Sequence, residues 1–169
     1  MSAEALAWPL HAIGDATVPM HVVGASGWGH RPFEEAVEDA WPRLIYLTDR
    51  PEQAEESRAL QRQQAARILS KAYTWRKYIL DWRARHPGEE TNLPVRDLVT
   101  ALAQETFDYA NSQQPTGWPY DSTASLLFLA SNVAAQGIYD NNAAVNLTRP
   151  LIENGVAVML AFLMSAMER

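Results

Sequence analysis

The feature that most constrains the fold is a long run of helical periodicity between Pro51 and Arg85. Apolar residues recur there at spacings of three and four, which places them on one face of an α-helix. That face consists of Ile68, Ala72, Trp75, Ile79 and Trp82. Acidic residues come first in the segment and basic residues follow, as the helix dipole favours. The segment 86–88, His-Pro-Gly, should end the helix because proline lacks the amide hydrogen that continues it.

Three further segments have helical periodicity bounded by turn or capping residues. They predict helices over 92–113, over 121–137 and from about Asn142 onwards. The last helix is apolar most of the way round, which is typical of a central helix, and Pro150 should kink or restart it. No segment alternates apolar and polar residues between hairpin turns, as a strand would. The predicted class is therefore all-α, with one domain over 1–169 that forms a bundle of about five or six helices.

The composition excludes several classes of protein. The chain contains no cysteine, which rules out disulfides, thiolate zinc fingers and cysteine nucleophiles. Its net charge of -6 is unlike that of a protein that coats nucleic acid. The opening residues lack the basic and apolar segments of a secretory signal peptide. The longest apolar stretch, 155–167, is shorter than the about 20 residues that span a membrane, so we expect a core helix and no transmembrane segment.

Three of the four histidines lie within the first 30 residues. His11 and Asp15 are four positions apart, as are His30 and Glu34, so each pair would share one face of a helix. His21 lies between the pairs, in a stretch rich in glycine. One such pair is common on exposed helices, but two pairs and a third histidine in one segment predict a metal site. Nitrogen and oxygen ligands without sulfur favour zinc, with manganese or iron as alternatives.

The pattern His-x3-Asp-x5-His followed by His-x3-Glu resembles the zinc-dependent bacterial phospholipases C, which share a superfamily with the single-strand-specific zinc nucleases. The stretches HAIGDATVPMH and GHRPFEEAVE carry this resemblance, which extends from about Trp8 to Trp41. A glutamate at position 34 is similar to the phospholipases, since the nucleases usually have aspartate there. The resemblance implies an all-α fold of the phospholipase C and zinc nuclease type.

The resemblance also implies a role for each residue of the pattern. His21, His30 and Glu34 would hold one zinc ion, with a position open as in catalytic zinc sites. His11 and Asp15 would hold a second zinc ion, and Asp15 would bridge to a third. Water activated by these ions would attack a phosphodiester, so the pattern names no separate catalytic side chain. The implied substrate is a phospholipid headgroup at a membrane surface, and the implied location is secreted or periplasmic.

The chain departs from that family in one respect. The family's other zinc ligands lie upstream of this pattern, but no histidine precedes His11 here. We therefore expect the C-terminal part of a longer phospholipase C-like domain, or a reduced relative, with weak activity. Two alternatives stay open: a single-strand-specific zinc nuclease, and a non-catalytic remnant with a structural zinc site. Trp28, in the glycine-rich stretch, is expected to line the site.

Overall fold

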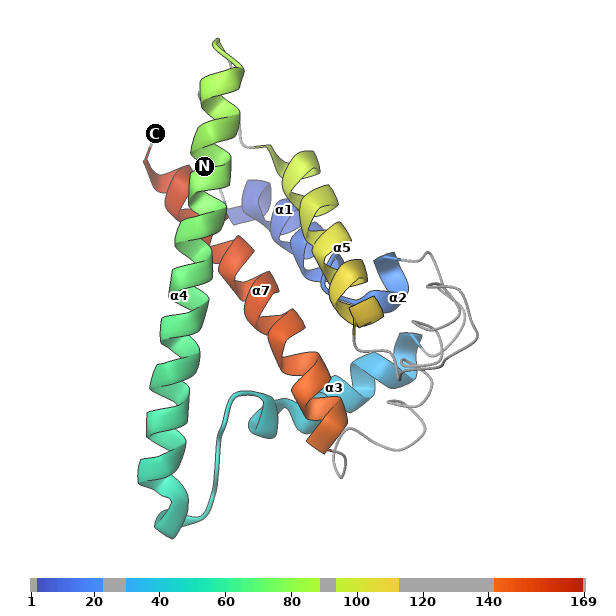
Figure 1. The fold of residues 1–169 in the computed structure, drawn as a ribbon, viewed down its shortest axis with the longest axis vertical. Coiled ribbons are helices and arrows are strands. Elements are labelled where there is room, and N and C mark those ends of the chain that lie inside the picture. The colour runs from blue at the N-terminus through green and yellow to red at the C-terminus, as the bar shows by residue number, and fades with distance from the viewer. Residues whose placement is uncertain (1–2, 23–29, 89–93, 113–141, 169) are drawn as a thin grey trace.

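The computed structural model describes residues 3–22, 30–88, 94–112 and 142–168. These residues form five helices of 13 residues or more and contain no strand (Figure 1). The helices are α1 (Ala3–Asp15), α2 (Pro19–Val22), α3 (His30–Leu44), α4 (Ala54–Arg85), α5 (Val95–Ser112) and α7 (Asn142–Met167), of which α2 is a single turn. The predicted all-α class is confirmed. The helix predicted over 121–137 lies outside the described residues.

The long periodic segment forms α4 almost as predicted. A short 3-10 turn, Pro51–Gln53, precedes the 32-residue helix, which ends before His86. Its predicted apolar face is buried at Ala72, Trp75 and Ile79. Trp82 is only partly buried, and its indole N–H donates a hydrogen bond of 2.6 Å to Asp97 Oδ2 at the start of α5.

Helix α7 is the central element of the described structure. It packs along α4 and also contacts α1, α3 and α5 (Figure 1). The fully buried residues of the core come mostly from α7 and from the faces of α4 and α5 turned toward it: Ala72, Ile79, Leu98, Leu102, Ala157, Val158, Ala161 and Phe162. This arrangement confirms the prediction of a central C-terminal helix.

Two positions of the same helix refine the prediction. The helix continues through Pro150, so of the two predicted effects of this proline, a kink or a restart, the restart is not observed. Val156 is 39% exposed, so α7 is not covered on every side by the described residues. By length and composition alone, Thr148–Met167 could cross a membrane, and 44% of it is buried inside the protein. Its packing against four other helices supports the interpretation of this stretch as a core helix.

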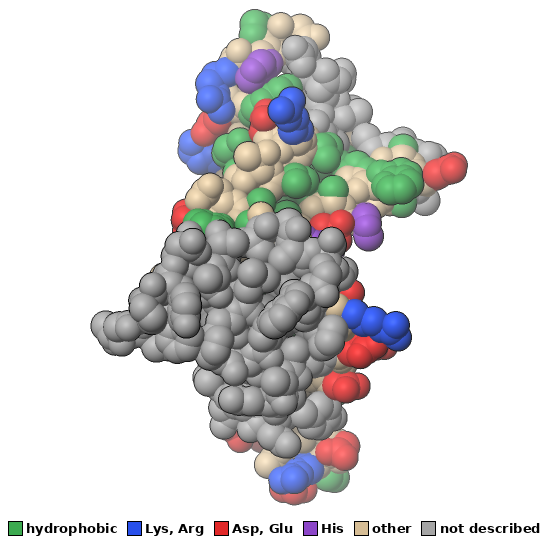
Figure 2. Space-filling view, turned by 90° about the vertical axis from the view of Figure 1, so that its right-hand side faces the viewer, with side chains coloured by type: hydrophobic (Ala, Val, Ile, Leu, Met, Phe, Trp, Pro, Cys, Tyr) green, Lys and Arg blue, Asp and Glu red, His purple; other side chains and the backbone are tan. Residues whose placement is uncertain are grey.

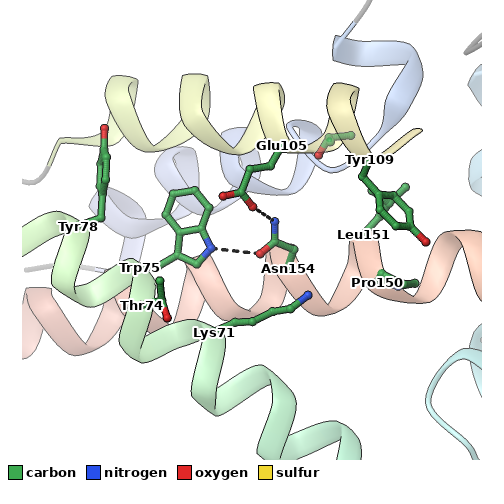
Figure 3. A pocket seen from close by; sticks show the side chains of 10 residues that line it. Lys71, Thr74, Trp75, Tyr78, Glu105, Tyr109, Pro150, Leu151 and Asn154 are labelled. Carbon is green, nitrogen blue, oxygen red and sulfur yellow. Dashed lines mark hydrogen bonds between the residues drawn. The ribbon is translucent and has the colours of Figure 1, made fainter. Parts of the chain in front are cut away.

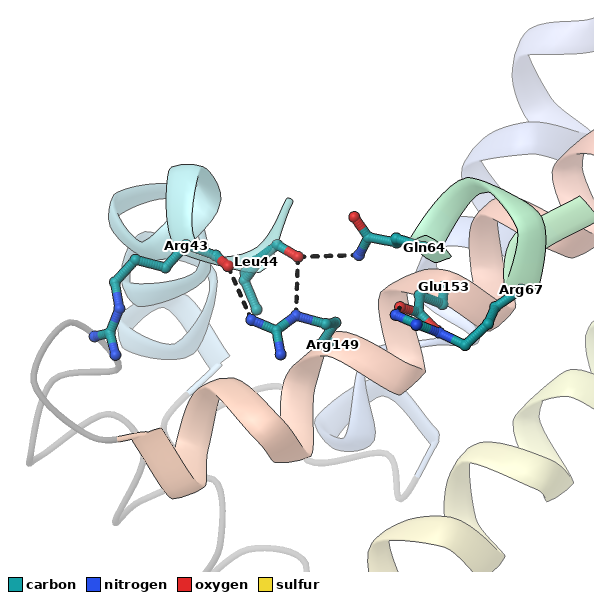
Figure 4. A network of polar contacts seen from close by, with 6 residues as sticks. All are labelled: Arg43, Leu44, Gln64, Arg67, Arg149 and Glu153. Carbon is teal, nitrogen blue, oxygen red and sulfur yellow. Dashed lines mark hydrogen bonds and ion pairs between the residues drawn. The ribbon is translucent and has the colours of Figure 1, made fainter. Parts of the chain in front are cut away.

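An ion pair joins the two longest helices. Arg67 on α4 donates two hydrogen bonds to the carboxylate of Glu153 on α7, at 2.7 and 3.2 Å (Figure 4). The Glu153 side chain is 5% exposed, whereas that of Arg67 is 45% exposed. The hydrogen bond to Glu153 raises the pKa of Arg67 above its ordinary value. The pair thus supplies the buried carboxylate with the partner that it needs.

Candidate metal site

The first two histidines meet one carboxylate where α1 turns into α2. Helix α1 ends at Asp15, and the Thr17 and Val18 amides donate to the carbonyls of Gly14 and Asp15 at 3.0 Å each. These bonds reverse the chain within three residues, so that α2 brings His21 back toward the end of α1. Asp15 thereby lies between two histidines, one on each helix.

The two oxygens of Asp15 face different histidines. Asp15 Oδ2 lies 3.4 Å from His11 Nε2, and Asp15 Oδ1 lies 3.3 Å from His21 Nδ1. Two ligands on a tetrahedral zinc ion, each at about 2.1 Å from the metal, are about 3.4 Å apart. Both distances are close to that spacing, and they are also the distances of direct contacts between an imidazole and a carboxylate. They are longer than the usual N–H···O hydrogen bond.

The corner is open to solvent yet anchored to the core. The side chains of His11, Asp15 and His21 are 69%, 41% and 25% exposed, respectively. In the view of Figure 2, histidine and acidic side chains lie beside each other on the surface. Ile13 and Ala16 are buried and hold the corner against the core. An ion or a small substrate could thus reach the corner from the solvent.

Two contacts from other helices position this corner. The buried hydroxyl of Thr106 on α5 donates to the carbonyl of Ala16 at 2.8 Å. On the other side, α7 approaches the turn at Gly155, where an added Cβ would overlap the Cγ2 of Thr17. Thr17 is itself fixed, because its hydroxyl donates to Gly14 O at 2.7 Å. The residues on either side of Asp15 are therefore restrained by α5 and α7.

The second predicted pair lies on α3, as its spacing indicated. His30 is the first residue of that helix, and Glu34 follows one turn later with an exposed side chain. The side chain of His30 and all of Trp28 lie outside what the structure describes. The predicted set of His21, His30 and Glu34 therefore stays a prediction. Among the described side chains, no three His, Asp or Glu residues form a group that could hold a metal ion by themselves.

The charge around the second pair includes an ion pair on the same helix. Arg31 donates a hydrogen bond of 2.7 Å to Glu35 one turn further on, and this bond raises the pKa of Arg31. Both side chains are well exposed, so the pair adds little to stability. Glu34 is the acidic residue nearest to His30 in the sequence.

A separate pocket of about 410 Å³ lies between α4, α5 and α7 (Figure 3). Aromatic side chains from α4 and α5 form much of its wall: Trp75, Tyr78 and Tyr109. The indole N–H of Trp75 donates to Asn154 Oδ1 at 3.1 Å, and Asn154 Nδ2 donates to Glu105 Oε2 at 2.7 Å. Burial raises the pKa of the Tyr109 phenol.

The pocket contains none of the five predicted metal ligands, but one residue links the two regions. Thr106 lines the pocket and bonds Ala16, which follows Asp15 in the chain. Sequence reasoning assigned Trp75 to the core and did not identify the pocket. A polar Asn154 in the middle of an apolar helix was the available signal, because a polar group at such a position needs a partner.

Comparison of the chain with protein-family models, with curated proteins and with solved structures finds no match. The case for a function therefore depends on the residues of the site and on the resemblance of their pattern.

Proposed function

We propose that the chain is a zinc-dependent phosphodiester hydrolase of the phospholipase C type, with His11, Asp15, His21, His30 and Glu34 as its metal ligands. One observation carries the proposal: Asp15 lies between two histidines, 3.4 Å from His11 and 3.3 Å from His21, which brings ligands of the two expected ions together. Asp15 would hold the ion of His11 and could bridge to a third, while His21 would hold the ion of His30 and Glu34. The spacing of the second pair on α3 supplies the other two ligands.

The ligand set also suits an anionic substrate. Even without a third ion, the two zinc ions that these five residues would hold would bring four positive charges against the two negative charges of Asp15 and Glu34. The remaining positive charge favours the binding of a phosphodiester between the ions. Zinc, when bound, supplies a Lewis acid for a phosphoryl oxygen and lowers the pKa of water. The protein's own part is to hold the ligands in place, which the anchored corner after α1 does for Asp15 and His21.

Two features favour a phospholipid over a nucleic acid as the substrate. The chain has a net charge of -6, which opposes the binding of a polyanion outside the site itself. The acid of the second pair is Glu34, as in the phospholipases that the pattern resembles. We propose accordingly that the enzyme acts on a phosphodiester headgroup at a membrane surface, in a secreted or periplasmic setting. A single-strand-specific zinc nuclease is the alternative enzyme, and a structural zinc site is the alternative without catalysis.

The test compares two substrates and two histidine variants. Hydrolysis of p-nitrophenyl phosphorylcholine and of a single-stranded DNA oligonucleotide is measured with and without excess zinc. The proposal expects zinc-dependent cleavage of the phosphorylcholine diester, lost in His21→Ala and retained in His86→Ala. His86 is a matched control because it lies at the end of α4, stacked on Trp82 with the ring centroids 4.1 Å apart. Cleavage of DNA instead would favour the nuclease, and tight zinc binding without turnover would favour the structural site.

A further inference from the structure

The C-terminal end of α3 is held by side chains from two other helices (Figure 4). Arg149 on α7 donates from Nε to Leu44 O at 3.1 Å and from Nη2 to Arg43 O at 2.9 Å. Gln64 on α4 donates to the same Leu44 carbonyl at 3.0 Å. We call these two side chains, Arg149 and Gln64, the α3 clamp.

The α3 clamp acts on the last two carbonyls of the helix, of which that of Arg43 also accepts from the Tyr46 amide at 3.3 Å. The last four carbonyls of a helix have no hydrogen-bond donor within it, and a cation is favoured at that end by the helix dipole. Leu44 is 1% exposed and Gln64 is 6% exposed, so this end of α3 is shielded from water. The Arg149 guanidinium also lies 4.1 Å from the centre of the Tyr46 ring, just after the helix. The clamp therefore fixes the end of α3 with a planar, charged group.

The other end of α3 carries the second pair of predicted ligands. The helix has 15 residues, which makes it about 22 Å long at 1.5 Å per residue. A tilt of about 5° at the clamped end would therefore move His30 by about 2 Å. Zinc sites tolerate deviations of only about 0.2 Å in ligand distance. A small change in how the Leu44 carbonyl is held would thus cause a large displacement at the metal site.

We infer that Arg149, supported by Gln64, is a positioning residue for the metal site, because it sets the direction of the helix that carries His30 and Glu34. This inference rests on the proposed zinc site for its functional meaning. Its structural content, the control of α3 by Arg149, is independent of any metal. The control of α3 is tested by measuring the orientation of the helix in zinc-free protein. Its effect on the metal site is tested by measuring zinc affinity.

The orientation of α3 is measured in zinc-free protein by double electron–electron resonance, which gives the distance between two spin labels. The chain has no cysteine, so Glu35→Cys on α3 and Gln63→Cys on α4, both exposed, take labels specifically. The inference expects Arg149→Met to broaden or shift the distance distribution and Arg149→Lys to restore part of it. The control is Arg76→Met, which breaks the ion pair between Arg76 on α4 and Glu168, just after α7, and leaves both donors of the Leu44 carbonyl in place.

Zinc affinity is then measured by competition with a chromophoric chelator, at a temperature at which every variant is folded. We expect Arg149→Met to weaken zinc binding at least tenfold, while Arg76→Met changes it by less than twofold. Equal losses in both variants would mean general destabilisation and would overturn the inference. An unchanged label distance in Arg149→Met would overturn it as well. If the wild-type protein bound no zinc but Arg149→Met still shifted the label distance, the proposed function would be refuted and the control of α3 by Arg149 would stand.

Discussion

The ion pair between Arg67 and Glu153 gives a prediction whose size follows from burial. Breaking a fully buried pair by removing one partner costs about 3–5 kcal/mol, because it leaves an uncompensated charge away from water. Glu153 is nearly buried, but almost half of the Arg67 side chain is exposed, so water can approach the carboxylate once Arg67 is truncated. We therefore expect Arg67→Met to lower the free energy of unfolding by about 2–3 kcal/mol.

The measurement is urea unfolding followed by circular dichroism, with two comparisons. The double variant Arg67→Met with Glu153→Met should regain most of the lost stability, since it removes both charges together. Lys77→Met breaks the exposed pair with Asp81 and should cost less than about 0.5 kcal/mol. If Arg67→Met cost no more than Lys77→Met, the reasoning from burial would be wrong. A double variant as unstable as the single one would refute it too.

Three further predictions follow from the site and its supports. Gly155→Ala should destabilise the protein by about 1–2 kcal/mol because the new methyl group overlaps Thr17 Cγ2, and adding Thr17→Ser should relieve the loss. Thermal unfolding of the two single variants and the double variant checks this. In an absorbance titration at 295 nm, Tyr109→Phe should remove a component that ionises above pH 10. Burial favours the neutral Tyr109 phenol in the folded state, so its contribution to stability is present below about pH 10 and lost as pH rises through the raised pKa. Finally, the 169-residue chain should hydrolyse p-nitrophenyl phosphorylcholine slowly even with excess zinc, because His11 and Asp15 give their ion only two ligands; full-rate turnover would contradict this ligand count.

Sequence periodicity predicted most of the described fold but little of its long-range contacts. The face of α4 and its end at His86 follow from local rules of spacing and capping, and both are observed. Val156 shows the limit of that reasoning. The sequence pattern of α7 predicts which residues share a face. The 39% exposure of Val156 depends instead on which faces of α7 pack against another helix. The clamp on α3 has no sequence signature, because Arg149 and Leu44 are brought together only by the packing of α7.

In the candidate site too, contacts within one helix could be predicted from the sequence, whereas contacts between elements could not. The pair of His11 and Asp15 could be predicted from a spacing of four, because both residues belong to one helix. The contact of His21 with the same Asp15 depends on the tight turn after α1, whose geometry the spacing alone does not specify. The aromatic pocket was not predicted, since its residues come from three helices that are far apart in the sequence.

The central claim is that this chain binds zinc through histidine and carboxylate ligands, and zinc stoichiometry with X-ray absorption at the zinc edge tests it most directly. Protein reconstituted at pH 7–8 should hold at least one zinc ion per chain, with nitrogen and oxygen neighbours at about 2.0–2.2 Å and no sulfur. His30→Ala and Glu34→Ala should each lower the zinc content sharply, while His86→Ala should not. Reconstituted wild-type protein without bound zinc would contradict the account.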